Sequence, residues 1–432
     1  MVTAATLFSM FFGAGNLIFP PMLGAGAGAS LAPMLGGFLV SAVALPVIAV
    51  IAIALSGEDI RDLTRRGGRL FGAVFPVLAY LSIGALYGVP RTAAVSFSAA
   101  VTPLTGWHSW GAMFAFSAVF FAVALALAFD RRGIVDALGR FLTPALLILL
   151  AVLVTLCLIM LPHTPAPASP APVGRAFASG FVQGYLTMDS VAALALGIIV
   201  VSALSDSGVP AGRRLVRGVS LAGVIAGACL AAVYVGLALV GARMPGGAGF
   251  ADGAALLSAA SEQTMGPAGA AIFGLIVLLA CLTTAVGLLG ATSAFFARLV
   301  PAISYHWWVI GFSVVALLIS TLGLEAVIAV AGPIIGFLYP ASITLVALSL
   351  LDAAIGRRLH LRMAYVLALA VATLWAALMT LESLGWGTAW ITPAIGWSPG
   401  HEQQLGWFLP TVAAAAIGAV IDLVGHRRSA AR

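Results

Sequence analysis

Long apolar runs with almost no charge are the feature that most limits what this chain can fold into. Of its 432 residues, 62% are apolar and 8% are charged, whereas soluble domains are about 45–50% apolar and about 25% charged. This composition excludes a water-soluble globule, a disordered tail and a nucleic-acid-binding module. Because a helix needs about 20 apolar residues to cross a bilayer, the runs predict an all-α polytopic membrane protein.

The apolar runs number twelve, and each of them predicts one transmembrane helix. They cover residues 3–28, 32–55, 70–101, 109–129, 141–161, 176–204, 219–241, 268–297, 307–323, 326–351, 363–384 and 407–424. All three cysteines lie inside these runs, where they offer neither a disulfide framework nor the spacing of metal ligands.

The distribution of arginine predicts the orientation. All 20 basic residues are arginines, and 17 of them lie in alternate loops and the C-terminal tail, at 56–69, 130–140, 205–218, 298–306, 352–362 and 425–432. Cytoplasmic loops carry an excess of basic residues, so we expect both termini in the cytoplasm. The net charge of +6 is then a topology signal. Arg91, inside the third span, is expected to snorkel outward or to pair within the bundle, in a structural or gating role.

The first span is interrupted by polar and flexible residues at its middle. It reads FFGAGNLIFPP from Phe11 to Pro21. Two glycines and an asparagine weaken a helix there, and the two prolines remove amide donors. Non-helical backbone at this depth survives only where it lines a cavity or is buried in protein. A close-packing glycine face is the alternative; at Gly13 and Gly15 we favour a broken helix.

The sixth span carries a second interruption. It reads GFVQGYLTMDS from Gly180 to Ser190, which places a Gln, a Tyr, a Thr and an Asp within seven residues. An ionisable residue inside a membrane span suggests a functional site, so we assign a functional role to Asp189. The alternative is an N-cap for a half-helix starting near Val191. The two interpretations are compatible, because a helix capped at mid-membrane is already broken.

Breaks in the first and sixth spans predict two inverted halves. Five spans per half is an odd number, so the second half is inserted upside down relative to the first. The predicted division is a first five-helix repeat at 1–161, an inverted repeat at 176–351 and two additional helices at 363–424. Matching breaks in inverted halves indicate a binding site at the membrane midplane of a secondary transporter.

The polarity of the breaks favours a zwitterionic amino acid as substrate. Amide donors around Gly15 and Asn16 would face a carboxylate, helped by the positive end of the helix dipole. Unwound carbonyls near Phe11, Phe12 and Tyr185 would face an ammonium group or Na⁺.

The eighth span contains a candidate cation site. The hydroxyls of Thr283 and Thr284, with the carbonyl of Ala280, could supply part of a Na⁺ shell, and the first span would complete it near Ser9 and Phe12. The alternative is that each threonine bonds a carbonyl of its own helix. Nowhere does a nucleophile elbow, a P-loop or a zincin pattern occur, so neither an enzyme nor an organic cofactor is predicted.

Four blocks of sequence resemble the branched-chain amino acid transport system II carrier family (the LIVCS family). They are Phe12–Pro21, Pro90–Phe97, Gly180–Asp189 and Ala280–Leu288, in the family's order. The resemblance implies Na⁺-coupled symport of leucine, isoleucine and valine by alternating access in a bacterial inner membrane. It also implies a LeuT-type fold with a five-plus-five inverted repeat and broken helices 1 and 6.

Together, these interpretations define two predicted sites. Na⁺ is assigned to Ser9, Phe12, Ala280, Thr283 and Thr284. Substrate is assigned to Phe11, Phe12, Gly13, Ala14, Gly15, Asn16, Tyr80, Gly184, Tyr185, Leu186, Met188 and Asp189. Two alternatives stay open: a proton-coupled amino acid transporter of the same fold, using Asp189, and a major-facilitator carrier of another small solute. The latter would have two six-span halves of the same orientation and no need for paired breaks.

Overall fold

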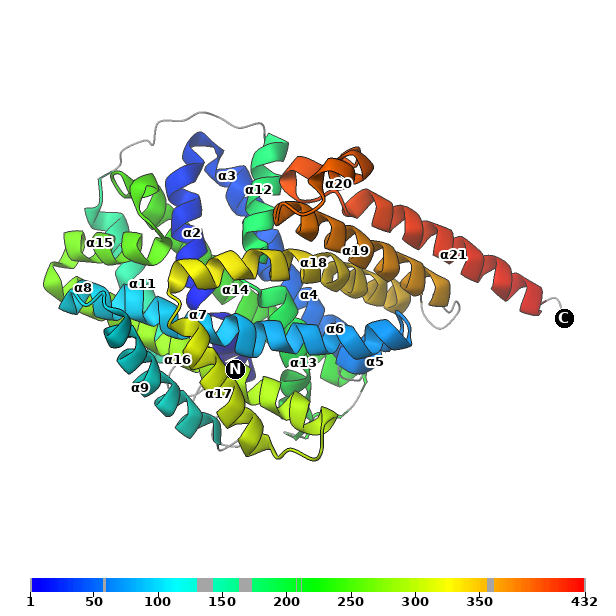
Figure 1. Cartoon of the computed structure of the whole chain (residues 1–432), viewed down its shortest axis with the longest axis horizontal. Helices are drawn as coiled ribbons and strands as arrows, with labels where there is room; N and C mark the ends of the chain where they lie inside the picture. The colour runs from blue at the N-terminus through cyan, green and yellow to red at the C-terminus, as the bar shows by residue number, and fades with distance from the viewer. Residues whose placement is uncertain are drawn as a thin grey trace. The chain divides into compact units, whose positions relative to one another are not determined.

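The computed structural model describes residues 2–56, 60–129, 143–162, 173–206, 208–210, 212–355 and 361–430. Within these ranges every regular element is helical and no β-strand occurs (Figure 1). The predicted loop 130–140, the first two residues of the fifth span, and Arg357 and Arg358 lie outside the described residues.

In the part of the chain that the structure describes, eight helical stretches are long and apolar enough to cross a membrane. They are Gly15–Leu55, Arg69–Thr105, Trp110–Phe129, Thr143–Met160, Arg213–Arg243, Pro267–Leu299, Leu324–Ile355 and Arg362–Ser383, and two shorter apolar helices cover Tyr305–Ser320 and Phe408–Val424. The prediction of an all-α, multi-spanning membrane protein is therefore confirmed. The count of twelve spans and the inverted repeat remain predictions.

The chain divides into two compact units, each assembled from separate segments. The first unit comprises residues 1–43, 80–188 and 221–331, and the second comprises 44–79, 189–220 and 332–432. The predicted division into repeats at 1–161, 176–351 and 363–424 concerns internal symmetry and stays a prediction.

The first unit is organised around one long buried helix, α16 (Pro267–Leu299). Its buried residues lie on all sides of the helix, as expected for an apolar helix enclosed by others. The helices that pack on it include α1 (Val2–Phe11), α7 (Gly88–Ser96), α9 (Trp110–Phe129), α11 (Thr143–Met160), α15 (Gly253–Met265) and α17 (Tyr305–Ser320).

The remaining helices of this unit hold the segments next to the two breaks. Helix α2 (Ala14–Ala27) continues through Pro20 and Pro21 and packs on α15. Helix α12 (Val173–Tyr185) packs along α3 (Leu31–Leu39). Most of α14 (Arg213–Arg243) also belongs to this unit.

The third span differs from the prediction of one continuous helix over 70–101. Helix α6 (Arg69–Leu81) gives way to a π-helical turn at Ser82–Leu86, and α7 is followed by a second π-helical turn at Phe97–Val101 and by α8 (Thr102–Thr105). Gly84 lies outside helical geometry, with ψ −109°. The carbonyl of Tyr80 accepts a hydrogen bond of 3.4 Å from the Thr292 hydroxyl of α16. A side chain of another helix thus compensates the backbone where the ladder is irregular.

The second unit consists of two helix pairs and their connections. Helix α4 (Leu45–Ser56) packs along α13 (Asp189–Asp206), and α19 (Arg362–Ser383) runs beside α21 (Phe408–Ala430) (Figure 1). Helix α20 (Thr388–Ile395) packs on α19. The unit also contains α5 (Ile60–Arg65), most of α6 and most of α18 (Leu324–Ile355).

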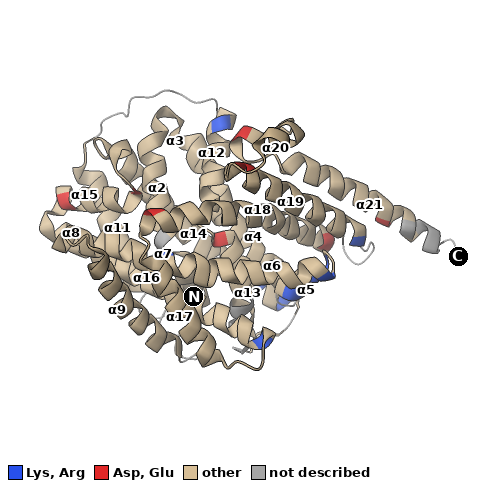
Figure 2. Ribbon diagram, viewed as in Figure 1, with Lys and Arg blue, Asp and Glu red and all other residues tan. Residues whose placement is uncertain are grey.

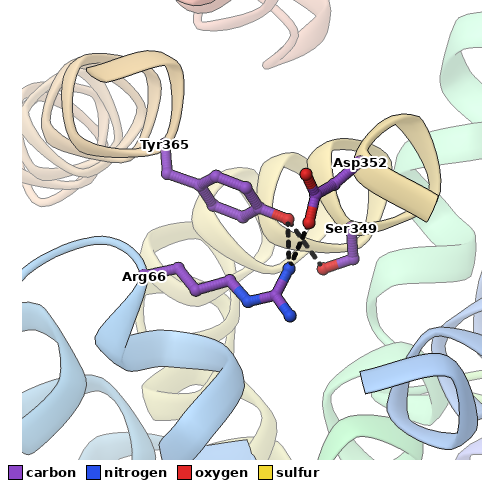
Figure 3. Close-up of polar contacts among 4 residues, drawn as sticks. All are labelled: Arg66, Ser349, Asp352 and Tyr365. Atoms are coloured by element: carbon purple, nitrogen blue, oxygen red, sulfur yellow. Dashed lines mark hydrogen bonds and ion pairs between the residues drawn. The ribbon is translucent and has the colours of Figure 1, made fainter. Parts of the chain in front are cut away.

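Among the described residues, Arg, Asp and Glu are sparse along the helices and lie mostly near helix ends (Figure 2). In the second unit, Arg66 follows α5 and donates from Nη1 to Asp352 Oδ2 at 2.7 Å and to the Tyr365 hydroxyl at 3.3 Å (Figure 3). The same hydroxyl lies 3.4 Å from Ser349 Oγ. Burial opposes protonation, but the contacts with Tyr365 and Asp352 outweigh it and raise the pKa of Arg66. This cluster joins the loop after α5 to α18 and α19.

Candidate functional site

The first predicted break lies between α1 and α2. Helix α1 ends at Phe11 and α2 begins at Ala14, while Gly13 is extended, with φ −126° and ψ −163°. In a continuous helix the Gly13 N–H would bond the Ser9 carbonyl. It donates instead to the Asn16 side chain, at 3.0 Å from Oδ1. The Ser9 carbonyl therefore loses its helical donor.

Asn16 links this break to α14. Its Oδ1 accepts from Gly13, and its Nδ2 donates to the hydroxyl of Tyr234. Asn16 and Tyr234 are both buried. Gly13 is the N-cap of α2, and Asn16, at the third helical position, accepts from its N–H in the way that the N3 residue of a capping box does. The Asn16 amide is held by contacts on both sides.

The other end of the break contacts α16 at the predicted Na⁺ site. The Phe12 carbonyl accepts a hydrogen bond of 3.2 Å from Thr284 Oγ1, because its helical donor, the Asn16 N–H, bonds the Gly13 carbonyl at 3.1 Å. A methyl group on Gly13 would come within 2.7 Å of Thr284 Oγ1. Glycine is therefore required for this close approach of the broken segment to α16.

The remaining predicted Na⁺ ligands have ordinary helical contacts. Thr283 Oγ1 donates to the Ala280 carbonyl at 2.9 Å, and Ser9 Oγ donates to the Thr6 carbonyl at 2.9 Å. These are the back-bonds that threonine and serine commonly make in helices. Thr284 differs from them because its hydroxyl bonds another helix. At Ser9, the carbonyl rather than the hydroxyl is the candidate ligand.

The second predicted break lies between α12 and α13. Helix α12 ends at Tyr185 and α13 begins at Asp189. The Met188 N–H turns back to the Tyr185 carbonyl at 2.9 Å, and Thr187 Oγ1 donates to the Gly184 carbonyl at 2.8 Å. Met188 has φ +67°, a left-handed conformation that is uncommon for a residue with a side chain. Such strain clusters at functional sites.

Arg91 of α7 connects the two breaks within the first unit. Its Nη1 donates to the Leu186 carbonyl at 2.9 Å, and its Nη2 donates to the Thr187 carbonyl at 3.4 Å. A methyl group on Gly15 would lie only 2.8 Å from Nη1 and 2.9 Å from Nη2. The guanidinium therefore lies against the first turn of α2 while it occupies the carbonyls freed at the second break.

Tyr87 holds the guanidinium from the other side. Its hydroxyl accepts a hydrogen bond from Arg91 Nη1, and its ring face lies beneath the guanidinium, with Cζ 4.5 Å from the ring centroid. Of the two expectations for Arg91, pairing within the bundle is the one observed, and the side chain is only 3% exposed.

The other predicted substrate residues lie in several surroundings. Met188 packs with its Cε 3.0 Å from where a methyl group on Gly88 would lie, at the start of α7. Tyr80 stacks on Phe295 of α16, with centroids 4.1 Å apart. Asp189 is buried and opens α13, as part of the second unit. An acidic residue in a first turn is stabilised by the helix dipole.

Sequence reasoning left three side chains out of the predicted site: Arg91, Tyr87 and Tyr234. Arg91 stood out as a lone charge in a span, but its place next to Gly15 depends on tertiary packing. Tyr87 lies one helical turn before it, a spacing that brings side chains together. Tyr234 was the only tyrosine in the seventh span, and nothing local indicated its partner.

Comparison of the sequence with known proteins places this chain in a family. The profile of the branched-chain amino acid transport protein family matches residues 1–424. The chain belongs to this family. Its members are transport proteins, which points to a multi-pass membrane transporter rather than an enzyme.

Two curated relatives illustrate the extent of the similarity. The branched-chain amino acid permease BrnQ of Corynebacterium glutamicum is 47% identical over 422 residues, covering 98% of this chain and 95% of the relative. The branched-chain amino acid transport system 2 carrier protein of Pseudomonas aeruginosa is 38% identical over 429 residues, covering 98% and 96%. The family resemblance predicted from the four sequence blocks is therefore confirmed.

Solved structures with a similar fold are much less identical in sequence to this chain. A nucleobase-cation-symport-1 family transporter in a closed conformation has a TM-score of 0.60 at 17% identity, covering 99% of this chain and 92% of that one. A Na⁺-coupled sialic acid symporter in an outward-open state has a TM-score of 0.61 at 11% identity, covering 97% and 89%. At these identities the likeness concerns the fold alone, and it agrees with the predicted all-helical class.

Proposed function

We propose that this protein is a Na⁺-coupled symporter that carries leucine, isoleucine and valine into the cell by alternating access. Its family membership and the names of its relatives support the substrate class. The proposed setting is a bacterial inner membrane, crossed by twelve spans arranged as a five-plus-five inverted repeat plus two helices, with both termini in the cytoplasm.

The break between α1 and α2 is the observation that carries this proposal. One helix ends there with the carbonyls of Ser9 and Phe12 deprived of their helical donors, and Phe12 is next to Thr284. At the start of the next helix, the N–H groups of Gly13 and Asn16 are bonded within the segment, whereas those of Ala14 and Gly15 lie in the first turn, where a helix offers no acceptor. Oxygen ligands on one side suit a hard cation, and N–H donors on the other suit a carboxylate.

Na⁺ is the proposed coupling ion, held by oxygens of Ser9, Phe12, Ala280, Thr283 and Thr284. Entry of one positive charge across 100 mV releases about 2.3 kcal/mol, which corresponds to roughly fifty-fold accumulation at 1.36 kcal/mol per decade. One Na⁺ per substrate, with its own gradient, is therefore sufficient. Discrimination among the three aliphatic substrates should be weak, since one methylene in an apolar pocket contributes only about 1–3 kcal/mol.

Proton coupling through Asp189 is the second candidate. The observation that favours it is the burial of this carboxyl side chain at the start of α13. A major-facilitator carrier is less well supported, because such a carrier has no need for paired interruptions of its helices.

Uptake of radiolabelled leucine into proteoliposomes tests the proposal. Three preparations receive an inward gradient of Na⁺, of Li⁺ or of protons alone, at a fixed membrane potential, and protein-free liposomes give the background. Saturable accumulation that requires Na⁺ is expected. Accumulation driven by the proton gradient alone would favour the second candidate. Failure to accumulate leucine under any gradient would contradict the proposed function itself.

A further inference from the structure

Arg91 is a buried cation whose charge no carboxylate neutralises among the described residues. It is 3% exposed, and its hydrogen-bond acceptors are two backbone carbonyls and a tyrosine hydroxyl. Taking a charge out of water is costly unless the charge is paired. An arginine kept in this state inside a membrane protein is by itself a functional-site hypothesis.

Two N–H donors of the Arg91 guanidinium have no hydrogen-bond partner among the described residues. Arginine has five N–H donors. Both N–H groups of Nη1 are used, on the Tyr87 hydroxyl and the Leu186 carbonyl, and one of Nη2 points to Thr187. Nε is buried and has no hydrogen-bond partner among the residues that the structure describes. One N–H of Nη2 and the N–H of Nε remain, and a pair of neighbouring arginine donors matches the two oxygens of a carboxylate.

The position of this guanidinium gives its ligand a second set of donors. Nη1 and Nη2 lie against Gly15, in the first turn of α2. N–H groups at the start of a helix and the positive end of its dipole favour an anion at this place. The helix start and the unpaired Arg91 donors are independent observations, each of which favours an anion, and the contact of Nη1 and Nη2 with Gly15 makes the two neighbours.

We infer that Arg91 is the residue that binds the carboxylate of the amino acid substrate, with the first turn of α2 as the second donor. This inference rests on the proposed function and adds to it a specific recognition residue. Arg91 also couples the two breaks, because the guanidinium that contacts Gly15 at the first break donates to the Leu186 and Thr187 carbonyls at the second. Substrate binding then neutralises the buried charge and fixes both breaks together.

The test compares two ligands that differ only at the carboxylate. Leucine and leucinamide are titrated into the purified, detergent-solubilised protein in Na⁺ buffer, and apparent affinities are measured from ligand-induced thermal stabilisation. For the wild-type protein, leucine should bind at least about 10-fold more tightly than leucinamide, the effect of a charge-assisted pair. In Arg91→Gln the ratio should fall to about 1–3. A merely structural role would weaken both ligands equally and leave the ratio unchanged, which would overturn the inference.

Two control variants keep the outcome interpretable. Arg243→Gln removes another arginine of the same unit, one that donates to the Leu158 carbonyl, and should preserve the ratio. Arg91→Lys keeps the charge but not the parallel donors, and should retain a reduced preference for leucine even where Arg91→Gln does not fold. An Arg91→Lys ratio equal to that of the wild-type protein would contradict the inference.

The source of the anion is tested separately. Titrations of the wild-type protein in chloride and in gluconate distinguish a substrate carboxylate from a bound inorganic anion. Equal binding of leucine and leucinamide, together with stabilisation by chloride, would assign Arg91 to the inorganic ion and overturn the inference. If none of leucine, isoleucine and valine stabilises the wild-type protein, the proposed function fails. If leucine binds and the ratio persists in Arg91→Gln, only the inference fails.

Discussion

Thr284 of α16 donates its hydroxyl to the carbonyl of Phe12, at 3.2 Å, although 272 positions separate the two residues in the sequence. Phe12 directly follows Phe11, the last residue of α1. The contact therefore joins the long central helix of the first unit to the unwound segment on which the proposed Na⁺ site depends. Breaking it should affect the cation before it affects the substrate.

We expect Thr284→Val to raise the Na⁺ concentration needed for half-maximal leucine uptake by about 10-fold, the usual effect of one lost polar contact. Valine keeps the shape of threonine and removes the hydroxyl oxygen. Uptake is measured in proteoliposomes over a range of Na⁺ concentrations. Selectivity among leucine, isoleucine and valine should not change.

Thr292→Val is the matched control for this substitution. Thr292 lies on the same helix and donates to the carbonyl of another segment, Tyr80, at 3.4 Å. It lies eight residues beyond Thr284 and is not one of the proposed Na⁺ ligands. The same change in Na⁺ dependence in both variants would show that loss of any such bond loosens α16, and would remove the cation assignment.

Gly15→Ala should abolish or strongly reduce leucine uptake, because the added methyl group would lie 2.8 Å from Arg91 Nη1 and must displace the guanidinium. Gly26→Ala is the control, since Gly26 lies on the same helix and no atom of the described residues lies within 4 Å of the added methyl group. Alanine favours a helix over glycine by about 1 kcal/mol, so the control should be at least as stable as the wild-type protein. Comparable uptake by the two variants would contradict the predicted role of this close contact.

The two helix breaks could be predicted from the sequence because their causes are local. Gly13, Gly15 and Asn16 weaken a helix through their own backbone and side-chain properties. Asp189 stands out because an ionisable side chain inside a membrane span is energetically costly. These residues stand out in runs of Leu, Ile, Val, Ala and Phe. The structure places the interruptions at Phe12–Gly13 and Leu186–Met188, inside the predicted segments, but Gly15, where a break was also expected, lies in the first turn of α2.

The contacts that connect the breaks could not be predicted, because they join residues far apart in the chain. Arg91 contacts Leu186 across 95 positions, and Asn16 contacts Tyr234 across 218. Apolar periodicity does not indicate which helices become neighbours. The irregular third span was missed for a related reason: Gly84 lies in an apolar run that reads as continuous, and its distorted backbone is compensated by α16.

If Na⁺ is the coupling ion, leucine uptake by Asp189→Asn should still depend on the Na⁺ gradient and should not respond to a proton gradient. Asparagine keeps the size of aspartate and loses only the charge–dipole interaction of the first turn, about 0.3–1 kcal/mol, so α13 should keep its N-terminus. Uptake is compared at two external pH values under a fixed Na⁺ gradient. Loss of accumulation in this variant, together with uptake by the wild-type protein under a proton gradient alone, would favour the proton-coupled mechanism.

Asp352→Asn should lower the free energy of unfolding by less than about 1 kcal/mol, because the ion pair with Arg66 is partly exposed and screened by water. The two side chains are 36% and 29% exposed. The pKa of Arg66 is raised, so its charge persists at every pH at which the protein can be assayed. Thermal unfolding at low and high salt measures the effect, which should shrink at high salt. A large loss of stability at both salt concentrations would show that the cluster is more than a surface ion pair.

The predicted orientation is testable with single introduced cysteines at exposed positions on opposite sides. Glu402 lies in the predicted external segment 385–406, and Ser304 lies in the predicted cytoplasmic loop 298–306; both are exposed. A membrane-impermeant thiol reagent added to intact cells should label Glu402→Cys and spare Ser304→Cys, whereas permeabilised cells should show both labelled. The native cysteines should give little background, since Cys157 and Cys281 are buried and Cys229 is partly buried. Labelling of Ser304→Cys alone in intact cells would reverse the assigned topology and place the arginine-rich loops outside.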